Sequence, residues 1–218
     1  MRLHTFVTAK NSFFAIGGPL STIKNFIQQI VAISDEELQE LMGILQEKHY
    51  KKKAVLTKAG EVESNLYFLT KGVVRIFFLK GKKDVTFDLA KENTITSSTN
   101  SLFTGRPSRY TLEALEPVTA LVLSKDKLDE LYTRSKKWQR FGRLVTTFFL
   151  LRQERGILER AMFTSRERFV RFVQNNPEFI QRVSQKHLAS YLGIKPETFT
   201  RMKRHLMHKK NPKNNHND

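Results

Sequence analysis

Residues 182–203 read RVSQKHLASYLGIKPETFTRMK. Leu188 and Leu192 lie one helical turn apart and give the first part of this stretch an apolar face. Gly193 follows at the place where a helix C-terminus favours a residue that tolerates positive φ. Pro196 can open a second helix, because the first turn of a helix does not use the N–H that proline lacks. The stretch therefore predicts two short helices joined by a tight turn.

The second of these helices has one apolar and one polar face. Phe199, Met202 and Leu206 recur at helical spacing and are expected to point to the core. The opposite face is rich in basic and polar side chains. A helix-turn-helix reads DNA by laying such a helix in the major groove. The alternative is an ordinary helical hairpin with a solvated charged face.

The order of residues within this stretch is informative. From Ser184 to Arg201 it follows the pattern S-Q-x-x-L-A-x-x-L-G-I-x-P-E-T-F-x-R. This pattern resembles the DNA-binding helix-turn-helix of the Crp/Fnr family of bacterial transcription regulators. The resemblance implies an α+β chain with three parts: an N-terminal β jelly roll of the cyclic-nucleotide-binding type, a long dimerisation helix and a C-terminal all-α helix-turn-helix domain. Its partner would be double-stranded DNA.

Helix geometry identifies the side chains that would read bases. Glu197 and Arg201 are four residues apart and share a helix face. Glu can accept from the cytosine amino group, and Arg can bind guanine O6 and N7 together. The two residues match two base-reading positions of the family. The third position is usually Arg but is Pro196 here, so we expect one base contact to be lost and the half-site specificity to be altered.

Other polar residues of the stretch are better placed for phosphates, as contacts that position the protein without reading sequence. Ser184, Gln185, Lys186 and Thr198 belong to this group, whereas Lys203 and Arg204 have the alternative of being only solvated. The complete set of expected DNA-binding residues is Ser184, Gln185, Lys186, Lys195, Glu197, Thr198, Arg201, Lys203 and Arg204.

The charge of the chain favours the same partner. The formal net charge is +17, and residues 137–218 hold 18 of the 38 Lys and Arg residues but only 6 of the 21 Asp and Glu residues. A basic C-terminal third is the expected electrostatic footprint for a phosphate backbone. The alternatives are a merely basic surface, or affinity for anionic lipid or RNA, but aromatic residues are not interleaved with the basic ones as a stacking platform would need.

Composition argues against catalysis and against a membrane. The chain has no cysteine, which excludes disulfides, thiol catalysis and cysteine-ligated iron–sulfur clusters. It has no Gly-rich phosphate loop, and its closest histidine pair, His205 and His208, lacks a third metal ligand. The longest apolar run, residues 144–151, is far shorter than the ~20 residues of a membrane span. We therefore expect no enzyme, no metal, no cofactor and no membrane partner, and nothing contradicts a cytoplasmic location.

The middle of the chain has the pattern of a β domain. Ser34 and Glu37 form a predicted capping box that opens a helix. The chain then changes to short β-branched and aromatic segments separated by turn residues, which indicates a sandwich or barrel. Residues 67–75 resemble the strand-turn-strand core of a cyclic-nucleotide-binding jelly roll, with Gly72 in the turn. The predicted strands are residues 55–57, 65–70, 72–79, 84–89, 110–115 and 118–124.

The ligand segment departs from the family. Members that bind cyclic AMP carry Gly-Glu near the start of a phosphate-binding segment and Arg-Ser or Arg-Thr near its end. Alignment on the strand at residues 110–114 places Ser97-Ser98 at the first pair and Ser108-Arg109, in reversed order, at the second. A shift of one residue on a strand turns a side chain to the other face, so Arg109 does not replace the usual anion clamp. We expect that this chain does not bind cyclic AMP.

The same segment can still be considered for an unknown small-molecule effector. Residues 96–101 are rich in hydroxyl groups, and hydroxyls with free backbone N–H groups can take an anion. The candidate ligand-binding residues are Ser97, Ser98, Thr99, Ser108 and Arg109. The alternative, which we prefer, is a polar surface loop with a vestigial pocket.

Residues 136–163 predict one long helix. Its apolar positions form a stripe that is wider than packing on one sheet requires, which suggests a partner as well as a core. In the family, this helix pairs with its copy in a second subunit, so we expect a two-fold homodimer, as suits half-sites on DNA. The alternative is that one chain covers both faces.

The expected organisation is an N-terminal extension (1–20), a jelly roll (21–135), a dimerisation helix (136–163), a helix-turn-helix domain (164–208) and a polar tail (209–218). The expected function is that of a sequence-specific regulator bound as a homodimer to an inverted repeat. A sensor module that acts through protein partners without binding DNA is the second hypothesis.

Overall fold

The computed structural model describes the backbone of residues 34–210 and the side chains of residues 34–206. The expected N-terminal extension (1–20) and residues 211–218 of the expected polar tail lie outside this range. The chain divides into two compact units, which we describe separately: unit 1 holds residues up to 76 together with 90–149, and unit 2 holds residues 77–89 together with 150 onward. The domain boundaries expected from the sequence remain a prediction.

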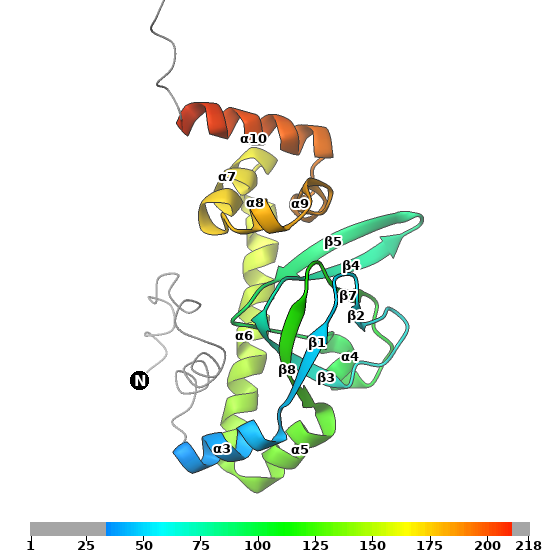
Figure 1. The fold of residues 1–218 in the computed structure, drawn as a ribbon, viewed down its shortest axis with the longest axis vertical. Coiled ribbons are helices and arrows are strands. Elements are labelled where there is room, and N and C mark those ends of the chain that lie inside the picture. Colours follow the sequence, from blue (N-terminus) through cyan, green and yellow to red (C-terminus); the bar gives the residue numbers. More distant parts are fainter. Residues whose placement is uncertain (1–33, 211–218) are drawn as a thin grey trace, which may run out of the picture. The chain divides into compact units, whose positions relative to one another are not determined.

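Two four-stranded sheets form the β domain (Figure 1). One has the strand order β1-β8-β3-β6 and the other β2-β7-β4-β5. The strands are β1 (Gln46–Tyr50), β2 (Val55–Thr57), β3 (Asn65–Lys71), β4 (Val74–Lys80), β5 (Lys83–Ala90), β6 (Thr94–Thr96), β7 (Thr111–Ala114) and β8 (Val118–Ser124). The pairings β1–β8, β2–β7, β3–β6 and β3–β8 are antiparallel. This is the expected jelly roll.

The central strand β3 is covered on both faces. Successive side chains of a strand point to opposite sides. Leu66 and Phe68 belong to the hydrophobic cluster that includes α-helical residues such as Trp138, whereas Tyr67 and Leu69, on the other face, are also buried. Burial on both sides explains why this strand is an almost continuous apolar run.

Gly72 makes the turn from β3 to β4, as the sequence predicts. Its φ is +91°, in the left-handed region that favours glycine. A Cβ atom at this position would lie 2.5 Å from the carbonyl oxygen of Pro117 and 2.8 Å from Val118 Cγ2. The turn therefore requires glycine for two reasons, its backbone conformation and the close approach of the neighbouring chain.

The described helices include the expected long helix as one continuous element, α6 (Figure 1). They are α3 (Asp35–Ile44), α4 (Thr99–Thr104), α5 (Lys125–Arg134), α6 (Lys136–Met162), α7 (Ser165–Asn175), α8 (Phe179–Arg182), α9 (Gln185–Leu192) and α10 (Pro196–Lys210). The capping box of α3 is confirmed: the Ser34 N–H donates to Glu37 Oε2 (2.8 Å) and the Glu37 N–H donates to Ser34 Oγ (3.2 Å).

Three elements are not predicted by the pattern of the sequence. Strand β1 is the polar run QEKHY and is largely exposed, so it shows no alternation of apolar and polar residues. Strand β6 is only three residues long. Helix α4 is built from TNSLFT, in which Ser, Thr and Asn are poor helix formers. Sheet pairing and tertiary packing, not local propensity, decide these three segments.

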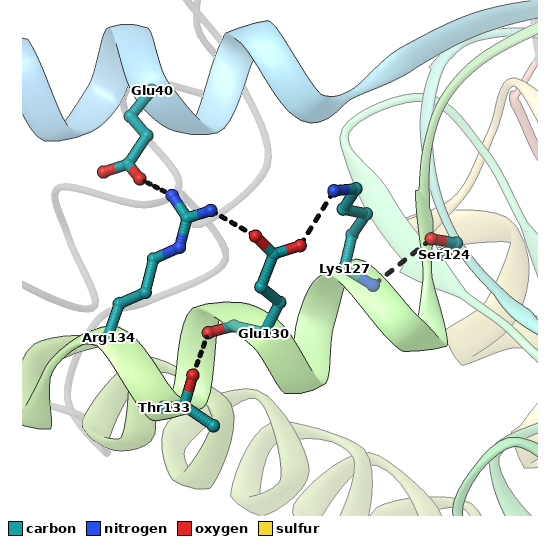
Figure 2. A network of polar contacts seen from close by, with 6 residues as sticks. All are labelled: Glu40, Ser124, Lys127, Glu130, Thr133 and Arg134. Carbon is teal, nitrogen blue, oxygen red and sulfur yellow. Dashed lines mark hydrogen bonds and ion pairs between the residues drawn. The ribbon is translucent and has the colours of Figure 1, made fainter.

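Polar side chains link α3 to α5 in unit 1 (Figure 2). Arg134 forms ion pairs with Glu40 of α3 and with Glu130 of its own helix. Glu130 also pairs with Lys127 at 2.8 Å, and the hydrogen bonds from Lys127 and Arg134 lower its pKa. Because these groups are largely exposed, the network contributes little to stability.

Aromatic side chains form the core of the helical part of unit 2. Phe169 and Phe199 meet edge to face, with ring centroids 5.2 Å apart and an interplanar angle of 87°. Phe172 stacks on Phe179 at 5.9 Å and touches Tyr191 at 5.4 Å. Burial raises the pKa of Tyr191 to about 12. These contacts join α7, α8, α9 and α10 into one small domain. The fold class is thus α+β, with a jelly roll followed by helices.

Candidate functional site

The turn between α9 and α10 has the expected geometry. Gly193 lies in the left-handed region with φ +68° and ψ 33°, and its N–H donates to the carbonyl oxygens of Ala189 and Ser190. At the other end of α9, the side chain of Ser184 accepts a hydrogen bond from the His187 N–H, which caps the helix. The two helices and the tight turn predicted from residues 182–203 are confirmed.

The inner face of α10 fixes the direction of its outer face. Phe199 is completely buried against Phe169. Arg168 of α7 holds the end of α9 by donating to the Leu192 carbonyl (3.2 Å), and it donates to the Phe163 carbonyl as well (2.7 Å). With one side of α10 anchored in this way, the residues on its other side point away from the helical core.

Most of the residues expected to bind DNA lie on this outward surface. Ser184, Gln185, Lys186, Lys195, Glu197, Arg201 and Arg204 are exposed, while Thr198 and Lys203 are half-buried. Among the described residues, neither Glu197 nor Arg201 takes part in a hydrogen bond or an ion pair formed by its side chain. The structure thus brings the predicted set together on one helix pair, and the contacts of these residues with bases or phosphates remain a prediction.

One polar contact of this surface was not foreseen. The Thr200 hydroxyl lies 2.9 Å from Gln185 Oε1 and 3.0 Å from the Pro196 carbonyl oxygen. It links the first turn of α9 to α10, across fifteen residues of sequence. Because the contact depends on how the two helices cross, no signal in the sequence could have identified it. It holds the Gln185 amide beside the expected base-reading face.

The outward surface is strongly cationic. Helix α10 has the sequence PETFTRMKRHLMHKK, with Glu197 as its single acidic residue. Lys186 and Lys195 add positive charge from α9 and from the turn. A surface with this balance attracts polyanions, in a manner that salt weakens.

The two halves of helix α6 differ in how far their apolar side chains are buried. Trp138, Phe141 and Val145 of its N-terminal half are buried in the hydrophobic core of unit 1. The C-terminal half exposes large apolar side chains: Leu150 (67%), Leu151 (49%), Ile157 (60%), Leu158 (48%) and Met162 (70%). Contiguous exposed apolar side chains mark an interaction surface. The wide apolar stripe is therefore a core contact at one end and an uncovered face, within the described residues, at the other.

The candidate ligand segment differs from the expected surface loop. Ser97, Ser98 and Ser108 are buried, and Ser98 is the N-cap of the short helix α4. Thr99 is half-buried, and Arg109 is exposed. The expectation of a polar surface loop at residues 96–101 is wrong for Ser97 and Ser98, because their hydroxyls, like that of Ser108, have partners inside unit 1. Whether any of the five residues binds a ligand stays untested.

Two further properties concern the described residues alone. In residues 34–206, His, Asp and Glu side chains form no group of three that could hold a metal ion. No helix in the described part of the chain combines the length and the apolar character needed to cross a membrane.

Comparison with known proteins agrees with the fold. Residues 47–135 match the family model of the cyclic nucleotide-binding domain. A search among curated proteins gives no match to the chain. Similar solved structures include FixK2 from Bradyrhizobium japonicum, which has a TM-score of 0.65 and 19% sequence identity, with 77% of this chain and 86% of that chain covered.

Two other solved structures are similar over most of their length. The c-di-GMP-responsive global regulator CLP of Xanthomonas campestris has a TM-score of 0.62 and 15% identity, with 81% of this chain and 93% of that chain covered. A CooA mutant from Carboxydothermus hydrogenoformans has a TM-score of 0.61 and 15% identity, with 90% and 86% covered. At these identities the similarity establishes a shared fold.

Proposed function

We propose that this protein is a sequence-specific DNA-binding transcription regulator of the Crp/Fnr type, acting in the cytoplasm. The observation that carries this proposal is the outward face of α10, where Glu197 and Arg201 are exposed one helical turn apart on a helix whose other face is anchored by Phe199. Such a pair can read a cytosine and a guanine in the major groove.

The backbone contacts would come from the first turn of α9 and from the turn before α10. Exposed Ser184, Gln185 and Lys186 surround the N-terminus of α9, and a helix N-terminus attracts phosphate oxygens. Lys195 adds a cation beside them. These groups would set the position of the protein on the duplex, and Glu197 and Arg201 would supply the sequence preference.

The exposed apolar face of α6 supports a homodimer. A second copy of this helix would cover Leu150, Ile157 and Met162, which a lone subunit leaves in water. A two-fold dimer presents two recognition helices to two half-sites, so the operator should be an inverted repeat. We propose that the effector, if the protein uses one, is not cyclic AMP.

The test is a selection of duplexes from a random pool by gel shift, repeated at several salt concentrations. The expected result is enrichment of an inverted repeat, with an affinity that falls steeply as salt rises because bound phosphates release counterions. A protein that acts only as a sensor through protein partners would enrich no sequence, and that outcome would refute the proposal.

A further inference from the structure

Glu63 is a buried carboxylate in the loop between β2 and β3, with 3% of its surface exposed. Burial of a charged group is costly unless hydrogen bonds replace the lost water. Three groups provide them here. The Asn65 N–H donates to Glu63 Oε1 (2.9 Å), the Ser98 N–H donates to Oε2 (3.3 Å), and the Thr57 hydroxyl donates to Oε2. The Tyr67 hydroxyl donates to the Leu56 carbonyl (3.0 Å) and also lies 3.4 Å from Glu63 Oε1.

The bond from Ser98 connects this carboxylate to the candidate ligand segment. Ser98 is the N-cap of α4, but its side chain makes no capping bond to the helix. The first N–H groups of a helix have no partner within the helix and need an acceptor from elsewhere. The Glu63 carboxylate is the acceptor for one of them, the Ser98 N–H, and the Glu63 N–H in turn donates to Ser101 Oγ in α4 (2.8 Å). Glu63 therefore bonds to the α4 region twice. Its side-chain carboxylate accepts from the Ser98 N–H, and its backbone N–H donates to Ser101 Oγ.

The hydroxyls of the segment are satisfied as well. Ser97 Oγ donates to the Asn65 carbonyl (2.8 Å), and the side chains of Ser98 and Ser108 bond to each other (2.8 Å). Ser108 also donates to the Tyr110 carbonyl (2.7 Å). An anion that accepted hydrogen bonds from these hydroxyls would have to break one internal bond for each bond it formed.

The charge of Glu63 also opposes the binding of a negatively charged ligand to residues 97–108. In the described part of the chain Glu63 forms no ion pair, so no cation neutralises it. The Glu63 charge affects two neighbouring groups. Burial, and after it the charge of Glu63, raise the pKa of both Tyr50 and Tyr67. A phosphate brought to this segment would meet a carboxylate of like charge in a poorly solvated place, where the repulsion is strong.

We propose that Glu63 is a built-in anion that takes the place of an external one: it assembles residues 97–108 into a single conformation without a ligand and excludes phosphate-bearing effectors from them. The jelly roll would then be permanently in its assembled state. This inference goes beyond DNA binding and does not depend on it, because every contact that carries it lies in unit 1.

The first test uses the wild-type full chain and hydrogen exchange followed by mass spectrometry. Residues 97–108 should exchange slowly in a buffer without added anions, and neither inorganic phosphate nor cyclic AMP at millimolar concentration should change that rate. Fast exchange that slows when either anion is added would overturn the proposal. The result does not depend on whether the protein binds DNA.

The second test replaces the carboxylate. Glu63→Ala removes the acceptor of the buried Ser98 N–H, and Glu63→Gln removes the charge and replaces one acceptor oxygen with a donor NH2 group. Each should speed exchange in residues 97–108 roughly tenfold or more. Acetate should restore slow exchange to Glu63→Ala, in a saturable manner that chloride at equal ionic strength does not reproduce. The matched control is Glu61→Ala, which removes an exposed carboxylate from the same loop.

The second test shows whether the charge of Glu63 or some other group holds residues 97–108 in one conformation. Faster exchange confined to residues 97–108, with rescue by acetate and none in the Glu61 variant, supports the built-in anion. Wild-type exchange in Glu63→Gln, or no rescue of Glu63→Ala by acetate, overturns it, because the segment would then be held by something other than the charge. If the variants do not fold, the wild-type measurement decides.

Discussion

Replacement of Arg201 by alanine gives the sharpest test of how the protein would recognise DNA. Arg201 is exposed on α10, and within the described residues its guanidinium makes no hydrogen bond or ion pair. The substitution should therefore leave the free energy of unfolding unchanged within about 0.5 kcal/mol, as is usual for surface positions. Any effect on DNA affinity would then come from the lost contact itself.

The size of that effect follows from the proposed contact. A bidentate bond from Arg to guanine contributes about 1–3 kcal/mol of discrimination. A homodimer loses the contact in both half-sites, so the cost on the selected inverted repeat is about 2–6 kcal/mol if the two sites are independent. This corresponds to an affinity loss of about 30-fold to about 10⁴-fold.

The assay is a titration of fluorescent duplexes at fixed salt, with the selected repeat and with variants changed at one base pair of each half-site. Arg201→Ala should weaken binding to the selected repeat and equalise the four bases at one position. The control is Arg204→Ala, an exposed cation of the same helix, which should weaken all duplexes alike and reduce the salt slope by about 1 for each copy. Uniform weakening by Arg201→Ala would show that Arg201 contacts a phosphate and would refute the assignment.

Three other predictions concern the framework. Leu158→Glu places a charge on the exposed apolar face of α6 and should convert the proposed dimer to a monomer in sedimentation velocity; an unchanged dimer would exclude this face. Because burial raises the pKa of Tyr191 to about 12, from about 10 in an unfolded chain, its stabilising effect should be complete below pH 10 and vanish as the pH rises through 12. Between pH 10 and pH 12, the urea midpoint of unfolding should accordingly fall less for Tyr191→Phe than for wild type. Parallel plots of the midpoint against pH would contradict the raised pKa of Tyr191. Gly72→Ala should lose about 1–3 kcal/mol through backbone strain alone and more through the clash with the Pro117 oxygen. Gly81→Ala, also at positive φ but with no atom within 4 Å of the added Cβ, should show only the strain, and equal losses would argue against the clash.

Helices α9 and α10 were predictable because their determinants are local. Gly193 needs only its own left-handed backbone to end α9, and Pro196 opens α10 within the same few residues. The capping box of Ser34 and Glu37 likewise acts over three residues. Gly72 was identified as the turn residue for the same reason, although the close approach of Pro117 to it could be seen only in the structure.

The candidate ligand segment shows where local reasoning ends. Its serines and threonines predicted a polar surface loop, because Ser and Thr are poor helix formers and are usually exposed. The buried acceptor of the Ser98 N–H, Glu63, lies 35 residues away from Ser98 in the sequence. Nothing in the composition of residues 96–101 indicates that such a partner exists.

Sequence alone determined the helix pair formed by α9 and α10, the positive charge on it and six of the eight described strands before it, since turn residues, caps and periodicity act over a few positions. Tertiary structure decided that Glu63 is buried against α4, that α6 is buried in its first half and exposed, within the described residues, in its second, and that Thr200 meets Gln185. The physical reason is that a buried polar group or an apolar face is stabilised only by the groups that surround it, and folding brings those groups together from distant parts of the chain.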